Sequence, residues 1–521
     1  MANLWVKKSI SSLLTQAGNS QMKRTLGAWN LVTLGIGAII GAGLFVRTAA
    51  ASAEAAGPAV TLSFIVAAIG CAFAGLCYAE FASMIPIAGS AYTYAYATMG
   101  ELMAWIIGWA LIMEYALGAA TVSIAWSEYL NNIMGGVIPY EWCHSPLEHV
   151  NRVVGAALTA FPADLAKTAK DGVLLLSDEQ IHSLPSALQG MVQTSSGMIN
   201  APALIILLLL TMLLIKGTQE SAIVNMVIVG VKVSIVLIFI AIGWGFINPA
   251  NHTPYLIPEN YDAAHAGIFK HGWGGVLGGA GIVFFAFIGF DAVSTAAQEA
   301  KNPAKDMPFG ILGSLVVCTI LYVLFSHVLT GVANWKEFAL AGKEASVAYA
   351  IQTYMHGYGW LAKAVSVAIL FGFSSVILVM LYGQSRVFTT MAEDGLLPKV
   401  FAELHPTFKT PYKSNWILFV FVGLFAAFIP GSMAGDLTSF GTLFAFVLVS
   451  LGVWLLRRSD PNMARPFKTP LVPLVPILGA LICLGMIVAL DPTTLKAAFS
   501  WMAIGLLVYF GYSQKRSKLQ Q

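Results

Sequence analysis

Charged side chains are scarce in this sequence. Only 10% of the 521 residues are Asp, Glu, Lys or Arg, whereas 58% are hydrophobic. Soluble domains carry roughly 25% charged residues. A soluble fold with so few charges could not cover its surface with polar groups, so the composition excludes a water-soluble protein.

Cysteine indicates neither a disulfide framework nor a metal site. Four of the five cysteines, Cys71, Cys77, Cys318 and Cys483, lie in apolar runs, which leaves Cys143 outside them unpaired. No C-x-x-C pair occurs, although this spacing is a common signature of metal and redox sites. We find no nucleophile with a matching base, no metal-ligand cluster and no cofactor motif. The sequence therefore predicts no enzyme, no catalytic or metal site and no cofactor.

Long apolar runs are the main feature that is present. Each is about 20 residues long, which is the length of helix that crosses a hydrocarbon core of roughly 30 Å. A cleaved secretory signal would be a single shorter run, so the series predicts a multi-pass membrane protein. The twelve predicted spans are residues 29–55, 58–85, 102–131, 200–215, 219–247, 273–299, 306–332, 357–391, 413–430, 437–456, 473–490 and 494–513.

Lysine and arginine are distributed unequally between the two sides of these spans. An even number of spans places both ends of the chain on one side, and both tails are basic. Most lysines and arginines outside the spans fall on that side, and the cytoplasmic side is usually the richer one. The pattern predicts that both termini are cytoplasmic. We expect the membrane to be an inner or plasma membrane. The net charge of +3 reflects this topology rather than a nucleic-acid partner. The long loop 132–199 is expected to form an outer cap or lid.

Glycine is concentrated in the first and sixth predicted spans. Four glycines lie within residues 35–43, and three more, Gly278, Gly279 and Gly281, precede the stretch 284–291. Each glycine weakens a helix by about 1 kcal/mol relative to alanine, so both spans are expected to break. Spans five apart run in opposite directions, and such paired interruptions indicate an inverted repeat with a site at mid-membrane depth. Close helix packing is the alternative use of these glycines, and it fits Gly278 better than residues 37–43.

Two ionisable residues are predicted at the same depth. Lys232 lies at the centre of the fifth span and Glu114 near the centre of the third. A charge there costs about 2.5–3.5 kcal/mol on insertion scales, so each residue suggests a function. Arg47, Glu80 and Glu128 lie toward the ends of spans, where they can pair or reach the interface.

Lys232 and Glu114 each have two interpretations. Burial disfavours the lysine ammonium and nearby carbonyl groups favour it, so Lys232 can bind a proton on one side of the membrane and release it on the other. Its alternative is a permanent bond to carbonyl groups at a helix end. Glu114 is interpreted as a partner for a cation or as a protonatable gate, with a structural carboxyl group as the alternative.

The expected breaks suit a zwitterionic amino acid. An unwound turn exposes N–H groups at the positive start of one half-helix and C=O groups at the negative end of the other. The N–H groups expected to bind the substrate carboxylate belong to Gly41, Ala42 and Gly43. The carbonyl groups expected to bind its amino group belong to Ile39, Phe285, Ala286 and Ile288.

Several motifs occur in an order that resembles a known family. The stretch 37–45, the sequence Phe-x-Gly-Phe-Asp that ends at Asp291, and Glu-Ala-Lys-Asn-Pro at 299–303 resemble the amino acid–polyamine–organocation superfamily. The segments 384–398 and 405–411 narrow the resemblance to bacterial members of the cationic amino acid transporter family. The resemblance covers about residues 25–515.

This resemblance implies an all-α LeuT-type fold with two inverted five-helix repeats and with helices 1 and 6 broken. In proton-coupled members a lysine on helix five takes the place of sodium, and Lys232 matches it. Glu114 matches a glutamate on helix three, and with Phe287 and Ser374 it is expected to form the side-chain pocket or gate. The implied divisions are a tail at 1–28, repeats at 29–247 and 273–456, peripheral helices at 473–513 and a tail at 514–521.

The sequence thus predicts a secondary active transporter that imports L-amino acids with protons by alternating access. Amino acid exchange without net proton movement is the alternative. A receptor would be expected to carry a signalling domain, and the tails are short. Both cationic and small neutral substrates remain open, because Glu114 favours the former and the bacterial relatives favour the latter. The expected partners are the amino acid, protons and the lipid bilayer, with the oligomeric state open.

Overall fold

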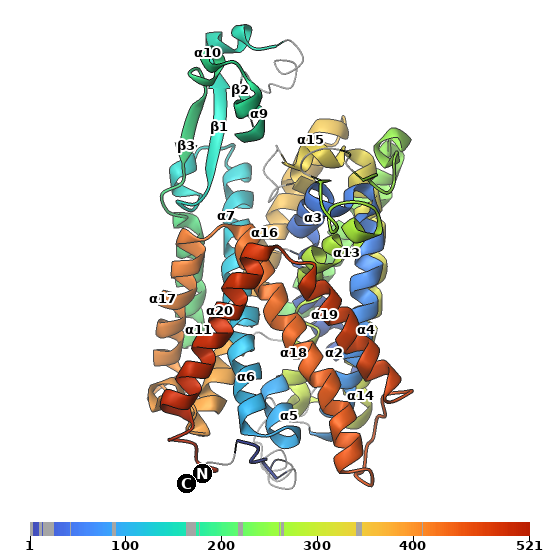
Figure 1. Ribbon diagram of the computed structural model, residues 1–521, viewed down its shortest axis with the longest axis vertical. Helices are drawn as coiled ribbons and strands as arrows, with labels where there is room; N and C mark the ends of the chain where they lie inside the picture. Colours follow the sequence, from blue (N-terminus) through green and yellow to red (C-terminus); the bar gives the residue numbers. More distant parts are fainter. Residues whose placement is uncertain are drawn as a thin grey trace.

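The structure, a computed structural model, describes residues 4–9, 13, 26–41, 43–85, 90–162, 173–176, 178–216, 222–259, 261, 265–339, 346–408 and 410–520. These residues form a bundle of helices with a small sheet projecting beyond one end (Figure 1). Both ends of the chain lie at the opposite end of the bundle (Figure 1). We call the two ends of the bundle the cap end and the terminal end.

Most of the described helices are long and apolar. Eight helical segments are long and apolar enough to cross a membrane, and four apolar helices are shorter. The helices are α2 (Ala28–Ile39), α3 (Thr48–Ala51), α4 (Val60–Met84), α5 (Ser90–Thr98), α6 (Glu101–Ile112), α7 (Gly118–Ile133), α11 (Ala201–Lys216), α12 (Ala222–Gly243), α13 (Gly272–Val283), α14 (Pro303–Val332), α15 (Ser346–Tyr354), α16 (Gly359–Glu393), α17 (Tyr412–Phe428), α18 (Gly431–Ser459), α19 (Leu474–Val488) and α20 (Pro492–Val508).

Most helix ends lie within a few residues of the predicted spans. The largest difference is α18, which begins at Gly431, whereas the hydropathy pattern places its start at residue 437. Its first turns contain two glycines, a serine and Asp436, which lower the local hydropathy without preventing a helix. The second half of the first predicted span continues into α4 within one apolar stretch, Gly43–Met84.

Both expected helix breaks are present. Helix α2 ends at Ile39, Ile40 is extended (φ −73°, ψ 101°), and helical structure resumes in the π-helical turn Gly43–Arg47. Helix α13 leads into the 3-10 turn Phe284–Phe287, which ends at an extended Ile288. Gly289 follows with φ +111°, a conformation that residues with a Cβ atom rarely adopt. The chain then continues in the 3-10 segment Asp291–Glu299.

The insertion between α7 and α11 contains a sheet that the hydropathy pattern did not indicate, because its strands are short. The strands are β1 (His149–Val154), β2 (Val173–Leu176) and β3 (Gln193–Ser196), in the antiparallel order β2-β1-β3. With the short helices α9 (Asp178–Ser183) and α10 (Ser186–Gln189), the sheet encloses its own core of Val153, Phe161, Leu174, Leu176 and Leu184. It extends away from the helices above α7 (Figure 1), so it is a separate small unit rather than a lid pressed on the bundle.

An ion pair joins this insertion to the bundle. The Nε2 atom of His144 lies 2.7 Å from Oε1 of Glu128 on α7, and its Nδ1 atom lies 3.1 Å from the carbonyl oxygen of Tyr140. Burial alone would lower the pKa of His144, but the hydrogen bond and charge of Glu128 outweigh it and raise the pKa to about 9. The imidazole is therefore protonated at neutral pH, and the ion pair is one of the two arrangements predicted for Glu128.

The terminal end is closed by contacts between distant parts of the chain. The buried carboxylate of Glu101 accepts hydrogen bonds from the Tyr96 hydroxyl (2.7 Å), the Tyr509 hydroxyl (3.0 Å), the Gln520 amide (2.7 Å) and the Ser517 hydroxyl. Beside it, the carboxylate of Asp394 accepts from Nζ of Lys8 at 2.6 Å and from the Tyr92 hydroxyl at 2.6 Å. Glu80 pairs with Arg457 (2.8 Å) and Arg465 (3.2 Å), as predicted for a charge near a span end.

Candidate functional site

The two helix breaks pack directly on each other. A Cβ atom added to Gly43 would lie 2.1 Å from the Cα atom of Ala286 and 2.6 Å from its backbone nitrogen. Glycine is therefore required at residue 43, because any side chain would push the backbones apart. The contact brings together groups predicted to hold the two ends of an amino acid, although Ala42 lies outside the described residues.

A tyrosine on α14 connects the same two breaks. Helix α14 packs on both α2 and α4, and the side chain of Tyr322 is fully buried. Its hydroxyl oxygen lies 2.9 Å from the carbonyl oxygen of Ile39 and 2.9 Å from that of Ala286. These two carbonyl groups, predicted to accept the substrate amino group, therefore face a common point.

Lys232 lies next to the first break. Its Nζ atom donates a hydrogen bond of 3.0 Å to the carbonyl oxygen of Gly37, in the last turn of α2. The side chain is 3% exposed, and its stem packs on Gly372 of α16, where an added Cβ atom would lie 2.8 Å from Cε of Lys232. A crevice beside it, lined by Gly41 and Phe45 among others, is too narrow for a water molecule. The ammonium group is thus enclosed by α2, α12 and α16.

Glu114 lies in a different, acidic environment. It belongs to the π-helical turn Met113–Leu117 between α6 and α7, and its fully buried carboxyl group faces Asp291 and the Thr442 hydroxyl. Asp291 accepts a hydrogen bond of 2.8 Å from the Tyr115 hydroxyl. No lysine, arginine or histidine of the described chain forms an ion pair with Glu114. The ionisable group that it faces is therefore a second carboxyl group, not a cation.

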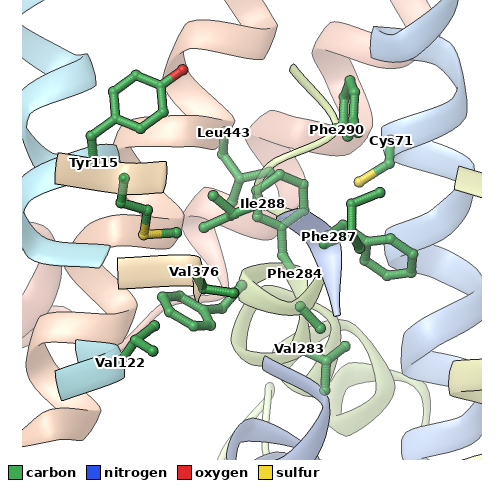
Figure 2. Packing of buried hydrophobic residues seen from close by; sticks show 14 of the residues in the cluster. Cys71, Tyr115, Val122, Val283, Phe284, Phe287, Ile288, Phe290, Val376 and Leu443 are labelled. Carbon is green, nitrogen blue, oxygen red and sulfur yellow. The ribbon is translucent and has the colours of Figure 1, made fainter. Parts of the chain in front are cut away.

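Apolar side chains line the space next to the second break. Phe284, Ile288, Val376 and Leu443 point toward one another from three different segments (Figure 2). All four are buried, and an added Cβ atom at Gly41 would lie 3.1 Å from Cγ2 of Val376. A substrate side chain that entered this region would meet hydrocarbon.

Phe287 and Phe285 have buried positions, as expected for a wall rather than a lipid-facing stripe. Phe287 is fully buried, Phe285 is 4% exposed, and the Phe287 ring centroid lies 5.3 Å from that of Tyr322 in an edge-to-face arrangement. Phe287 therefore packs behind the break on the α14 side.

Ser374 is not brought to the breaks. Its hydroxyl donates a 2.9 Å hydrogen bond to the Leu370 carbonyl within α16. Gly372 and Val376 are the residues of α16 that contact Lys232 and Gly41. A helix turns by about 100° per residue, so Ser374, two residues from each, points to the opposite side.

A buried ion pair lies on the cap side of the first break. Arg47, at the end of the π-helical turn, pairs with Asp436 of α18, and its Nη1 atom lies 3.4 Å from the Ser432 carbonyl oxygen. The side chain of Arg47 is only 3% exposed. The pair ties the half-helix after the break to α18, and it is one of the two arrangements predicted for Arg47.

Among the residues that the structure describes, no group of three or more His, Cys, Asp or Glu side chains could hold a metal ion. The site consists of backbone groups from two breaks, one lysine, one tyrosine, a pair of carboxyl groups and an apolar wall. Such a set can bind and release a small molecule and a proton. Sequence reasoning missed Tyr322, whose signal was only a tyrosine inside an apolar span.

Comparisons with known proteins give a consistent result. Residues 26–511 match the family described as amino acid permease. The chain is 42% identical to the branched-chain amino acid permease BcaP of Bacillus subtilis over 99% of its own length and 98% of that protein. It is 38% identical to the methylthioribose transporter of Bacillus subtilis over the full length of both. It is 31% identical to the vacuolar cationic amino acid transporter 4 of Arabidopsis thaliana over 89% of this chain and 68% of that protein.

Proposed function

The chain belongs to the amino acid permease family, and we propose that it imports neutral branched-chain amino acids together with protons. Membership makes it a multi-pass membrane transporter of amino acids and not an enzyme. The proposal adds three things to that: the driving ion, the substrate side chain and the residues that bind each.

The proposed architecture has twelve spans in two inverted repeats. Helices up to α12 form the first repeat, at 29–247, and helices from α13 to α18 form the second, at 273–456. Helices α19 and α20 are peripheral, and the terminal end faces the cytoplasm of a cell membrane. The two breaks, which lie in corresponding helices of the two halves, support this arrangement.

The substrate head group is proposed to lie between the two breaks. Backbone N–H groups of residues 41–43 would bind its carboxylate, and the carbonyl groups of Ile39 and Ala286 would bind its ammonium group. Irregular backbone at membrane depth occurs only where it lines a cavity or is covered by protein. The contact between Gly43 and Ala286 would then open and close around the substrate.

Lys232 is proposed as the proton-binding group. As an ammonium it donates to the Gly37 carbonyl and holds the last turn of α2 against α12. Loss of the proton removes the charge and weakens that bond, since hydrogen bonds from ionised donors are roughly twice as strong as neutral ones. Proton release would therefore loosen α2 and favour opening toward the terminal side.

A pH gradient tests the coupling. Purified protein in liposomes is expected to accumulate leucine when the outside is acidic, and Lys232→Met is expected to bind leucine but lose at least about 90% of gradient-driven uptake. Uptake that needs internal amino acid and ignores the gradient would favour exchange instead. Full gradient-driven uptake in Lys232→Met would contradict the role of this lysine.

The substrate side chain is proposed to be neutral and branched. Two relatives, from Bacillus subtilis and Lactococcus lactis, are named branched-chain amino acid permeases. The wall formed by Ile288, Val376 and Leu443 offers hydrocarbon contacts (Figure 2). Glu114 faces a second carboxyl group, that of Asp291, and the side chains of the wall are uncharged, which favours a neutral ligand over a cationic one.

A binding panel tests the side-chain preference. Leucine, isoleucine and valine are expected to compete with labelled leucine at least about 10-fold better than arginine or lysine, since 1.4 kcal/mol corresponds to a factor of ten. The similarity to a methylthioribose transporter makes methylthioribose a necessary member of the panel. Stronger competition by methylthioribose than by any amino acid would replace the proposed substrate.

A further inference from the structure

We propose that the Tyr322 hydroxyl is a placeholder for the substrate ammonium group in the empty carrier. The inference rests on the proposed function, because it assigns Tyr322 a role at the same site. Tyr322 is a positioning residue in this scheme. It holds the two breaks together when no amino acid is bound, and it gives way when one arrives.

The geometry of the hydroxyl carries the proposal. Its oxygen lies 2.9 Å from the carbonyl oxygens of both Ile39 and Ala286. A tyrosine hydroxyl has a single hydrogen to donate, so the two carbonyl groups must share it. An ammonium group has three hydrogens and can satisfy both carbonyl groups at once. The substrate therefore offers these acceptors a better partner than the tyrosine does.

The region beside the two carbonyl groups is tightly packed, so the hydroxyl and an ammonium group cannot both occupy it. Tyr322 is fully buried, as are Ile39 and Ala286 to within 2%. The backbone at Gly43 lies directly on Ala286, so the breaks enclose no free space on that side. An ammonium nitrogen that binds both carbonyl oxygens takes up the region that the hydroxyl occupies here.

Aromatic side chains surround the Tyr322 ring, and their contacts do not involve its hydroxyl. The Tyr322 ring packs against Phe64 with centroids 5.4 Å apart and against Phe287 at 5.3 Å. These contacts come from α4 and from the second break. Replacing only the hydroxyl therefore leaves the ring contacts intact, which makes Tyr322→Phe a conservative variant.

The placeholder would serve the return of the empty carrier. A symporter must change conformation once with substrate and once without it, and the empty form needs its own stabilising contacts between the breaks. The bridge from α14 supplies them. Exchange of one amino acid for another does not require the empty form to change conformation, so exchange is expected to depend less on the bridge than net uptake does.

Tyr322→Phe is expected to bind leucine about 2- to 10-fold more tightly than wild type, because the competing hydrogen bond is removed. Net uptake driven by a pH gradient is expected to fall relative to leucine–leucine exchange in the same liposomes. Tyr509→Phe is the matched control: it also removes one buried hydroxyl, which bonds Glu101 at 3.0 Å, and it is expected to leave leucine affinity unchanged.

A second replacement keeps the hydroxyl and so protects the test against misfolding. Incorporating 3-fluorotyrosine at residue 322 makes the hydroxyl a stronger donor, and leucine binding is expected to weaken. Tighter leucine binding in Tyr322→Phe together with weaker leucine binding in the fluorotyrosine protein would support the proposal. Unchanged or weaker binding in Tyr322→Phe, or tighter binding with fluorotyrosine, would overturn it. Absence of leucine binding to wild type would instead overturn the proposed substrate, and the placeholder with it.

Discussion

Single residues with the same sequence signal have different surroundings in the fold. Lys232 and Glu114 are both ionisable side chains in the middle of apolar spans. Lys232 donates to the carbonyl group of Gly37 at the end of α2, whereas Glu114 faces the carboxyl group of Asp291. An ammonium group stabilised by a helix C-terminus and a carboxyl group beside a second carboxyl group respond to protons in different ways, so the two residues call for separate experiments.

Glu114→Gln is expected to change the affinities of neutral and cationic amino acids by the same factor, to within about threefold, since a residue outside the side-chain pocket alters all substrates uniformly. The measurement is the competition panel described above. Glu128→Gln is the control, because Glu128 pairs with His144 near the insertion. Selective loss of arginine and lysine binding would place Glu114 in the side-chain pocket and restore a cationic preference.

Tyr322 shows which residues sequence reasoning misses. Its importance depends on two carbonyl groups, Ile39 and Ala286, that lie far away in the sequence. Neither periodicity nor composition reports such a contact. The sequence also does not show that Ser374, predicted for the side-chain pocket or gate, lies on the side of α16 away from the breaks. The hydropathy of α16 locates the helix but does not show which side faces the site, and Gly372 and Val376 occupy that side.

At the scale of helices, the breaks were predictable because their cause is local. Glycine weakens a helix wherever it occurs, and Gly289 adopts a φ of +111° that few other residues tolerate. The spans were predictable because the membrane imposes their length. The sheet of the insertion was not predictable. Strands β2 and β3 contain four residues each, which is too few for a clear alternation of apolar and polar side chains.

Gly43→Ala tests the contact between the breaks. The added methyl group would lie 2.1 Å from the Cα atom of Ala286, so the backbones must separate. We expect loss of uptake and a destabilisation of about 1–3 kcal/mol, as for other overpacked sites. Thermal unfolding and leucine uptake measure the two effects.

Gly230→Ala is the control for this prediction. An added Cβ atom at Gly230 of α12 meets nothing within 4 Å, and alanine favours a helix by about 1 kcal/mol over glycine. Uptake by this variant should equal that of wild type. Normal uptake by Gly43→Ala would show that the breaks do not need to touch during transport.

At the scale of the whole molecule, a titratable contact joins the insertion between α7 and α11 to the bundle. The pKa of His144 is raised to about 9 beside Glu128, above the ordinary value near 6.5. A raised pKa in the folded state contributes stability that is fully present below pH 6.5 and is lost as the pH rises through about 9. The junction is therefore expected to weaken in alkaline solution.

The thermal unfolding temperature of the wild type should decrease as the pH is raised from 7 to 10. His144→Gln should remove most of that pH dependence. His182→Gln, at an exposed position on α9, serves as the control and should keep the wild-type profile. A His144→Gln protein with the same pH profile as wild type would show that this ion pair does not stabilise the junction.

The contacts of Glu101 have a consequence for biosynthesis. Tyr509, Ser517 and Gln520, which surround its carboxylate, are translated about 400 residues later, 408 to 419 positions along the chain. At roughly 5–20 residues per second, Glu101 waits for tens of seconds at the membrane surface without these partners. The terminal face can be completed only after α20 has left the ribosome and entered the bilayer. A nascent chain that stalls before that point lacks three of the four described donors to the Glu101 carboxylate and keeps only the Tyr96 hydroxyl.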